Sequence, residues 1–280
     1  MSPGSSPLPL RQAVALGVLQ GPTEMLPVSS SAHTTLVPFL LGWPYSRLDG
    51  ELRKSFEVAL HAGAGAALAI DMRGELAHAA RRLDGRRLST IALSLLPAAI
   101  AGLALGPAVE RRLGGPRSIA AGLAGGGVAM AIADARPGAG ERSHDDASPA
   151  DGLALGLAQA VALVPGVSRH GATLTAARAR GFSRSGARSL SWHAALPVML
   201  AASALQGARL SRRRPPAGAA APLAAGAASA FASTLLSARL LRKAAGAPRS
   251  LLACSLYRCL LAALVLARLR RPDTANAQPI

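Results

Sequence analysis

The sequence predicts an all-α integral membrane protein with about six spanning helices and two re-entrant helix pairs in an inverted-topology repeat. Three observations support this prediction. Half of the 280 residues are hydrophobic, and they gather in long blocks rather than at amphipathic spacing. Many of the arginines lie between these blocks, where they can anchor at lipid headgroups. A polar motif with Gly, Pro and Ser occurs at corresponding places in the two halves of the chain.

The spanning helices are predicted from six apolar blocks that meet or approach the length of about 18 residues needed to cross a bilayer. The blocks cover residues 55–72, 88–107, 118–134, 188–206, 217–238 and 250–267. The first is interrupted by Glu57 and His61, and all are rich in Ala and Gly, which let membrane helices approach closely. We therefore expect a multi-pass membrane protein rather than a soluble one.

The net charge of +17 would suggest a nucleic-acid partner if the protein were soluble. Aromatic side chains, on which bases stack, make up only 3% of the chain. The basic residues instead form clusters beside the apolar blocks, as at Arg86–Arg87 and Arg212–Arg214. The charge therefore predicts contact with a membrane surface and no nucleic-acid partner.

The chain divides into two repeats joined by a polar linker at residues 135–150. The first repeat is residues 1–134 and the second is residues 151–280. Each contains Gly-x-x-Gln, beginning at Gly17 and at Gly156, followed by an apolar run, a proline and a Val-Ser pair. Three spans follow each copy, so the two halves should enter the membrane with opposite orientation, as in an inverted repeat.

The apolar segments around each motif are too short or too interrupted to cross a membrane. They lie at about residues 8–43 and 151–180 and are broken by Pro and Gly. Such pieces at corresponding places in two halves indicate re-entrant helix pairs. Their turns would place backbone N–H groups and hydroxyls in a cavity lined by protein.

The first motif is "QGPTEMLPVSSSAH", residues 20–33. Gln20 and Glu24 are four residues apart and therefore share one helix face. A carboxylate at membrane depth is costly unless it is paired, bound to metal or hydrated. Glu24 is thus a partner in an interhelical hydrogen bond, a residue at the level of the lipid headgroups, or a functional group, namely a general base or a ligand for Mg²⁺ or Ca²⁺.

The serine run of the same motif consists of Ser29, Ser30 and Ser31. One of them is expected to cap a helix that starts near Ala32. Three hydroxyls at the positive end of a helix also form an anion site. His33 follows one turn inside, and we predict that it is catalytic, as a nucleophile toward phosphorus or as a general acid.

The second motif, "PGVSRHGAT" at residues 165–173, supplies Arg169. A guanidinium inside a re-entrant turn needs an anionic partner, and phosphate oxygens suit its fork. Ser168 and Thr173 add hydroxyls. The alternative is a salt bridge from Arg169 to Glu24. Both interpretations can be true, with the salt bridge present when no substrate is bound. Together the two motifs offer the groups that phosphoryl transfer requires.

These two motifs resemble the signature regions of the undecaprenyl-diphosphate phosphatase family, also known as the bacitracin-resistance family. The blocks "SFEVALHAGAGAALAI" at 55–70 and "ALPVMLAA" at 195–202 resemble the segments that follow them. The resemblance implies a bacterial inner-membrane enzyme that hydrolyses undecaprenyl diphosphate to undecaprenyl phosphate, recycles the carrier for cell-wall synthesis and confers bacitracin resistance. It also implies a polyprenyl diphosphate lipid as substrate and Mg²⁺ or Ca²⁺ as cofactor. The resemblance leaves open whether the protein forms a homodimer.

The resemblance carries over to individual residues. It implies catalytic roles for Glu24, Ser30, His33 and Arg169, with Glu24 also the metal ligand. It implies substrate binding by Gln20, Ser168 and Thr173. The neighbouring Ser29, Ser31 and His170 are predicted to bind substrate with them. The chain departs from the family pattern at His170, which replaces a usual serine, and at His61, which replaces a usual glutamine.

Two other functions compete with this one. A transporter or flippase of an anionic polyprenyl lipid would use the same inverted repeat and broken helices. The serine, histidine and arginine set favours bond cleavage, because transport needs only reversible binding. A lipid phosphatase of the acid-phosphatase type is disfavoured, because no histidine follows Arg169 at the distance that such a site requires.

Overall fold

The computed structural model describes residues 8–43, 45, 48–136, 141–211, 218–243 and 250–270. The described part contains α-helices, a short 3₁₀ segment and an isolated bridge between Arg142 and Phe182, with no strand. The predicted all-α class is therefore confirmed. Residues 137–140 of the predicted linker and Arg212–Arg214 lie outside the described residues.

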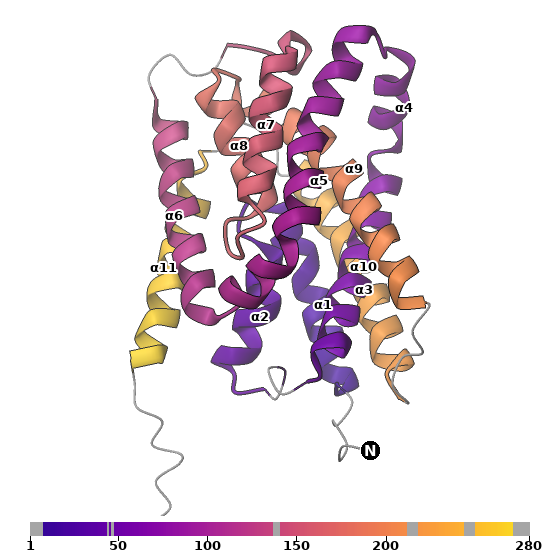
Figure 1. Ribbon diagram of the computed structural model, residues 1–280, viewed down its shortest axis with the longest axis vertical. Helices are drawn as coiled ribbons and strands as arrows, with labels where there is room; N and C mark the ends of the chain where they lie inside the picture. Colours follow the sequence, from indigo (N-terminus) through magenta and orange to yellow (C-terminus); the bar gives the residue numbers. More distant parts are fainter. Residues whose placement is uncertain are drawn as a thin grey trace, which may run out of the picture.

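The helices follow a similar order in the two halves of the chain (Figure 1). The first half contains α1 (Leu10–Met25), α2 (Ser30–Leu40), α3 (Gly50–Asp71), α4 (Arg73–Arg81), α5 (Gly85–Leu113) and α6 (Pro116–Ala135). The second half contains α7 (Pro149–Val161), α8 (Arg169–Ala179), α9 (Arg184–Ser211), α10 (Ala220–Lys243) and α11 (Leu252–Arg270). Two short helices are followed by three long ones in each half, and the short α4 is an addition to the first.

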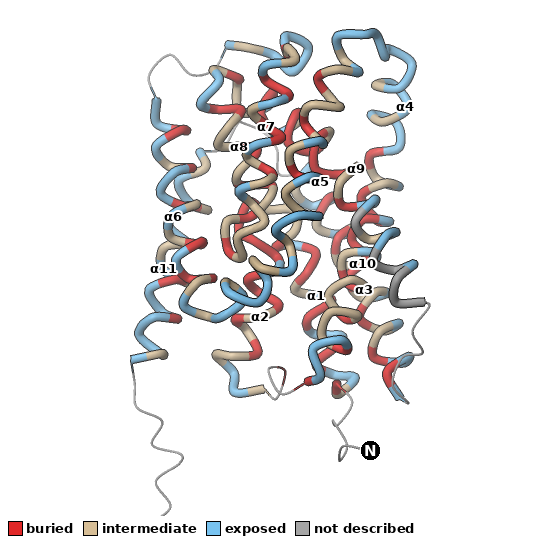
Figure 2. Tube along the Cα trace, viewed as in Figure 1, coloured by how far each residue is buried: buried red, intermediate tan, exposed pale blue. Residues whose placement is uncertain are grey.

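The six long helices fall on the six predicted apolar blocks. Four of them, α5, α6, α10 and α11, are long and apolar enough to cross a membrane. Large apolar side chains on their outer faces are exposed, as at Leu103 and Leu260, each 70% exposed, and Figure 2 shows the buried residues gathered toward the interior. In a membrane such faces contact lipid tails, so the chain is a multi-pass membrane protein. The count of six spans stays a prediction.

The two short helix pairs form hairpins, which we call the first hairpin (α1 and α2) and the second hairpin (α7 and α8). Their helices have 16, 11, 13 and 11 residues. At 1.5 Å per residue, even the longest extends only about 24 Å, less than the roughly 30 Å hydrocarbon core. Figure 1 shows the hairpins in opposite halves of the molecule, with their turns toward the middle. This arrangement agrees with the inverted repeat, which remains our interpretation.

Each hairpin is packed against a long helix of the other half of the chain. Helix α1 lies on α10, and α7 lies on α5. Glycines allow these close approaches: a Cβ added at Gly17 would lie 2.6 Å from the carbonyl oxygen of Gly226, and one at Gly156 would lie 2.3 Å from that of Leu93. Gly17 and Gly156 begin the two Gly-x-x-Gln motifs, so the repeated sequence has a repeated packing role.

A carboxylate, Asp151, fixes the open end of the second hairpin, opposite its turn. Its two oxygens accept hydrogen bonds from Arg142 at 2.7 Å and 3.2 Å and from Arg180 at 2.7 Å. Asp151 also forms a capping box with Ser148 at the start of α7. The bonds of the capping box satisfy backbone N–H groups that the start of a helix leaves unpaired.

A second carboxylate, Asp134, joins α6 to α8 and α9. It accepts hydrogen bonds from Arg178 at 3.0 Å and from Arg184 at 2.9 Å. Arg178 is buried and also donates to the carbonyl of Phe182 at 2.6 Å. This cluster fixes the end of α8 that lies far from the turn.

Candidate active site

The carboxylate of Glu24, in the last turn of α1, gathers polar groups at the tip of the first hairpin. Gln20 donates its amide N–H to Glu24 Oε2 at 2.9 Å, as expected for residues on one helix face. Ser30 donates its hydroxyl to the same oxygen at 2.6 Å, and His61 Nε2 lies 4.0 Å from it. All three contacts fall on Oε2, so Oε1 is left for another partner.

The residues around Glu24 fit a divalent cation that shares its ligands with a substrate. Gln20 Oε1 is buried and has no hydrogen-bond partner, which leaves a second oxygen beside the carboxylate. Within the described ranges, no group of three or more His, Cys, Asp or Glu side chains could hold a metal. Mg²⁺ is often bound by only one or two carboxylates together with substrate phosphates, and this donor set suits that arrangement.

The turn of the first hairpin, residues 26–29, arises from the sequence Leu26-Pro27. Residues before proline are driven out of the helical region, and Leu26 accordingly adopts ψ 149 and ends α1. The chain then turns through Ser29, whose φ of 74 is left-handed. This turn brings Ser30 back against the end of α1, where it reaches Glu24.

The serine run differs from its prediction in one respect. Helix α2 begins at Ser30 rather than near Ala32, and its N-cap Ser29 makes no side-chain capping bond. In the second hairpin, by contrast, Ser168 accepts from the N–H of Gly171 at 3.1 Å. The first N–H groups of α2 therefore lack a side-chain cap, which suits the start of a helix that binds an anion.

His33 faces α11 rather than Glu24. Its Nδ1 lies 2.7 Å from the carbonyl oxygen of Ser29, which can only accept, so Nδ1 carries the proton. Its Nε2 lies 2.7 Å from the hydroxyl of Tyr257, which then donates. The ring is 2% exposed. His33 is thus held as one neutral tautomer, with both nitrogens occupied by protein groups.

Arg169 begins α8 at the tip of the second hairpin and is half-buried. A Cβ added at Gly171, two residues after Arg169, would lie 3.4 Å from the carbonyl oxygen of Pro27, so the start of α8 lies against the first turn. The ion pairs of the described residues do not include Arg169 with Glu24, which argues against the salt-bridge alternative. The guanidinium is therefore left to bind an anion that lies between the tips.

Two predicted substrate-binding residues of the second motif have protein partners in α9. His170 Nδ1 lies 2.6 Å from Ser191 Oγ, and the ring stacks on Trp192 at a centroid distance of 4.5 Å. The Thr173 hydroxyl also contacts Ser191. These contacts belong to the packing of α8 on α9, so both side chains hold the tip of the second hairpin against α9.

Arg258, in the middle of α11, contacts both hairpin turns and was missed by the sequence analysis. It donates to the carbonyl of Pro27 at 3.2 Å in the first turn, and to those of Gly166 at 3.2 Å and Val167 at 2.7 Å in the second turn, residues 162–168. The side chain is 0% exposed. The available signal was an arginine in the middle of an apolar block, which marks a functional position by default.

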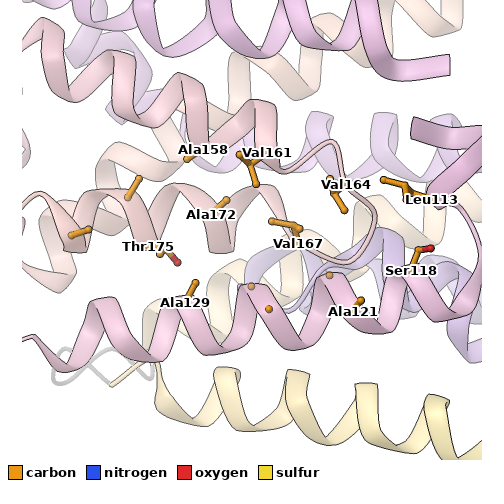
Figure 3. Close-up of a pocket in the computed structure, with 15 residues that line it drawn as sticks. Leu113, Ser118, Ala121, Ala129, Ala158, Val161, Val164, Val167, Ala172 and Thr175 are labelled. Atoms are coloured by element: carbon orange, nitrogen blue, oxygen red, sulfur yellow. The ribbon is translucent and has the colours of Figure 1, made fainter. Parts of the chain in front are cut away.

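An apolar cavity of about 620 Å³ lies beside the second turn. Figure 3 shows its walls: α6 with Ala121 and Ala129, α7 with Val161, and the turn with Val164 and Val167. Its lining is dominated by small aliphatic side chains. An apolar chain attached to a group at the tips could therefore lie in this cavity.

Comparisons with known proteins agree on one family. The profile described as "Bacitracin resistance protein BacA" matches residues 13–264. "Undecaprenyl-diphosphatase" of Geobacter sulfurreducens is 39% identical over 244 residues, covering 83% of this chain and 88% of the relative. The protein of the same name from Geobacter metallireducens is 40% identical over 226 residues, covering 76% and 81%. "Undecaprenyl-diphosphatase 2" of Stutzerimonas stutzeri is 38% identical over 209 residues, covering 70% and 75%.

Proposed function

The chain belongs to the BacA family of bacitracin resistance proteins, and from this premise we propose that its two hairpin tips form the active site of an undecaprenyl-diphosphatase. The enzyme acts in the bacterial inner membrane. It hydrolyses undecaprenyl diphosphate to undecaprenyl phosphate and inorganic phosphate. This reaction returns the lipid carrier to cell-wall synthesis and confers bacitracin resistance. The observation that carries the proposal is the Glu24–Ser30 pair, which lies beside the turn that meets the start of α8, the helix that carries Arg169.

The diphosphate binds between the tips. Arg169 supplies a guanidinium fork that matches two phosphate oxygens. The uncapped N–H groups at the start of α2 lie at the positive end of that helix and attract the same anion. These groups neutralise charge on the equatorial phosphate oxygens, where it develops during phosphoryl transfer.

Ser30 is placed to attack, and Glu24 is placed to take its proton. A hydroxyl that donates to a carboxylate at 2.6 Å is the arrangement of an activated nucleophile and its base. The Ser30 oxygen forms a bond to the terminal phosphorus, and the bond from that phosphorus to the bridging oxygen breaks. Undecaprenyl phosphate leaves with the electron pair. Glu24 then releases this proton to solvent. Water attacks the phosphorus of the phosphoserine while Glu24 takes a proton from it, the bond from phosphorus to Ser30 Oγ breaks, and Glu24 returns the proton to Ser30 Oγ as inorganic phosphate leaves.

His33 is proposed to hold the turn that carries the nucleophile. Its ring binds the carbonyl of Ser29, next to the nucleophile, and is fixed by Tyr257. The leaving group is a phosphate monoester, which is a weak base and departs without a strong proton donor. His33 is therefore proposed to position the serine turn rather than to protonate the leaving group.

A divalent cation, Mg²⁺ or Ca²⁺, would be held by Glu24 Oε1 and Gln20 Oε1 together with the substrate. When bound, it would neutralise negative charge on the diphosphate oxygens. The unpaired, buried Gln20 Oε1 supports this part of the proposal.

The prenyl chain is proposed to enter the apolar cavity between α6 and the second hairpin (Figure 3). Val164 and Val167, in the turn that precedes Arg169, line this cavity. A lipid with its diphosphate at Arg169 could therefore place its first isoprene units against these side chains. The small residues of α6 leave the necessary room, as at Gly125, where an added Cβ would meet no atom within 4 Å.

The test is phosphate release from a long-chain polyprenyl diphosphate by purified protein, with and without Mg²⁺ or Ca²⁺. We expect turnover by the wild type and loss of turnover in Arg169→Ala and His33→Ala, with each variant still eluting as folded protein. A transporter would move labelled lipid between leaflets without releasing phosphate. Release by Arg169→Ala at the wild-type rate would contradict the assignment of the anion site.

A further inference from the structure

We propose that Arg258 is a positioning residue that locks the two hairpin turns together in the conformation that the reaction requires. The proposal rests on the proposed function, because it concerns the same tips. Arg258 touches no group that reacts. It acts through the backbone of the turns.

The contacts of Arg258 join three parts of the molecule. The guanidinium donates to carbonyls of the first turn, the second turn and α6. Its five acceptors are the backbone oxygens of Pro27, Gly122, Leu123, Gly166 and Val167, at 2.7 to 3.4 Å. Among the described residues, Arg258 forms no ion pair with a carboxylate. The guanidinium thus binds backbone carbonyls rather than forming a salt bridge.

A buried cation in an apolar helix is costly, and a well-packed apolar side chain at the same place would avoid that cost. The packing of α11 therefore does not require an arginine at position 258. What an apolar side chain could not do is donate several hydrogen bonds in fixed directions. The planar fork of a guanidinium does this, and the ammonium of lysine does not.

The space for the fork is formed by two glycines on other helices. A Cβ added at Gly126 of α6 would lie 2.2 Å from Arg258 Nη2, and one at Gly171 of α8 would lie 2.5 Å from Nη1. Gly171 is two residues after Arg169. The guanidinium therefore lies directly against the start of the helix that carries the anion-binding arginine.

The hydrogen bonds to the turns fix the orientation of their peptide planes. In a trans peptide the C=O and the following N–H point in opposite directions. Because the Val167 carbonyl points at Arg258, the N–H of Ser168 points away from it. Ser29 and Ser168 both have positive φ, at 74 and 68. Such residues persist only where their surroundings hold them, and each turn has a carbonyl within two residues of its serine bound to Arg258.

The test compares Arg258→Lys with the matched control Arg178→Lys. Both arginines are buried and bind backbone carbonyls, but Arg178 lies at the far end of α8. The assay is phosphate release from polyprenyl diphosphate, with kcat and KM expressed per folded molecule. We expect Arg258→Lys to lower kcat about 100-fold, the effect of misplacing catalytic groups by about 1 Å through a mutation outside the reacting groups, with KM within about threefold of wild type. Arg178→Lys should lower the thermal unfolding midpoint and leave kcat within about twofold.

A second variant, Gly126→Ala, tests the proposal if Arg258→Lys does not fold. Gly126→Ala keeps the charge and displaces the fork, so it should also lower kcat with little change in KM. Wild-type kcat per folded molecule in Arg258→Lys, or a rise in KM with kcat unchanged, would overturn the proposal. If instead the wild-type protein releases no phosphate, the proposed function itself fails, and the two failures are distinct.

Discussion

The hydroxyl of Ser30 lies 2.6 Å from the carboxylate of Glu24, and this contact closes the first hairpin across its turn. The two residues come from different helices and are six positions apart. A proline ends the first helix and a left-handed serine starts the second, and together these bring the pair into contact. The proposed nucleophile and base are therefore a product of local sequence, whereas Arg169, the proposed anion-binding residue, comes from the other half of the chain.

Glu24→Gln removes the charge and keeps the shape of the side chain. Ser30 then loses its base, and we expect kcat for phosphate release to fall about 100- to 10,000-fold, the usual contribution of acid–base catalysis. The control is Glu110→Gln, which removes an exposed partner of Lys54 and should leave turnover unchanged. Equal losses in both variants would show that the effect of Glu24→Gln is not specific to the tip.

Tyr257→Phe removes the donor that fixes His33 Nε2. One hydrogen bond contributes about 1 kcal/mol, so we expect kcat to fall roughly fivefold. Tyr45→Phe is the matched control, because the buried Tyr45 hydroxyl has no hydrogen-bond partner in the described structure. That change should preserve kcat and leave the thermal unfolding midpoint equal or raised. Unaltered kcat in Tyr257→Phe would remove Tyr257 from the site.

Gly156→Ala tests the packing of the second hairpin on α5. The added Cβ would lie 2.3 Å from the carbonyl oxygen of Leu93, so the helices must separate. Overpacking of this kind costs about 1–3 kcal/mol of unfolding free energy. Gly106→Ala on α5 meets no atom within 4 Å and should be neutral or stabilise by up to about 1 kcal/mol through helix propensity. Thermal unfolding in detergent measures both, and equal midpoints would contradict the close contact.

Asp151 predicts how stability depends on pH. Burial alone would raise the pKa of its carboxyl, but hydrogen bonds from Arg142, Ser148 and Arg180 hold that pKa below its usual range. The folded state thus favours the ionised form. This stabilisation is complete above the unfolded pKa of about 3.9 and is lost as the pH falls through the lower, folded pKa.

Asp151→Asn should therefore lower the unfolding free energy at neutral pH by about 1–3 kcal/mol, because two arginines lose their acceptor. It should also flatten the decline of the unfolding midpoint below about pH 4, where the wild-type carboxyl takes up a proton in the unfolded state but not in the folded state. Thermal scans at several pH values test this. A decline below that pH as steep as in the wild type would assign acid sensitivity to other carboxylates.

The sequence predicted most of the helical framework, because the length and polarity of an apolar block are local properties. The block predicted at 118–134, for example, is α6 at Pro116–Ala135. The Gln20–Glu24 contact also followed from helical spacing alone. Proline and glycine positions indicated both hairpins.

The contacts that the sequence could not give depend on distant parts of the chain. Arg258 meets Pro27, and Tyr257 meets His33, across more than 200 positions. Nothing local at His33 indicates that its ring turns toward α11. The start of α2 was also misplaced, because the left-handed Ser29 lets the helix begin directly after it.

The reciprocal docking of the hairpins has a consequence for the order of biosynthesis. Helix α1 leaves the ribosome first, yet α10, on which it lies, begins at Ala220. At roughly 5–20 residues per second, the interval between them is on the order of 10–40 s. During that interval a segment carrying Gln20 and Glu24 has no completed binding surface. Nascent α1 is therefore without its packing partner for that interval, and we expect a chain truncated before α10 to leave this face of α1 unpacked.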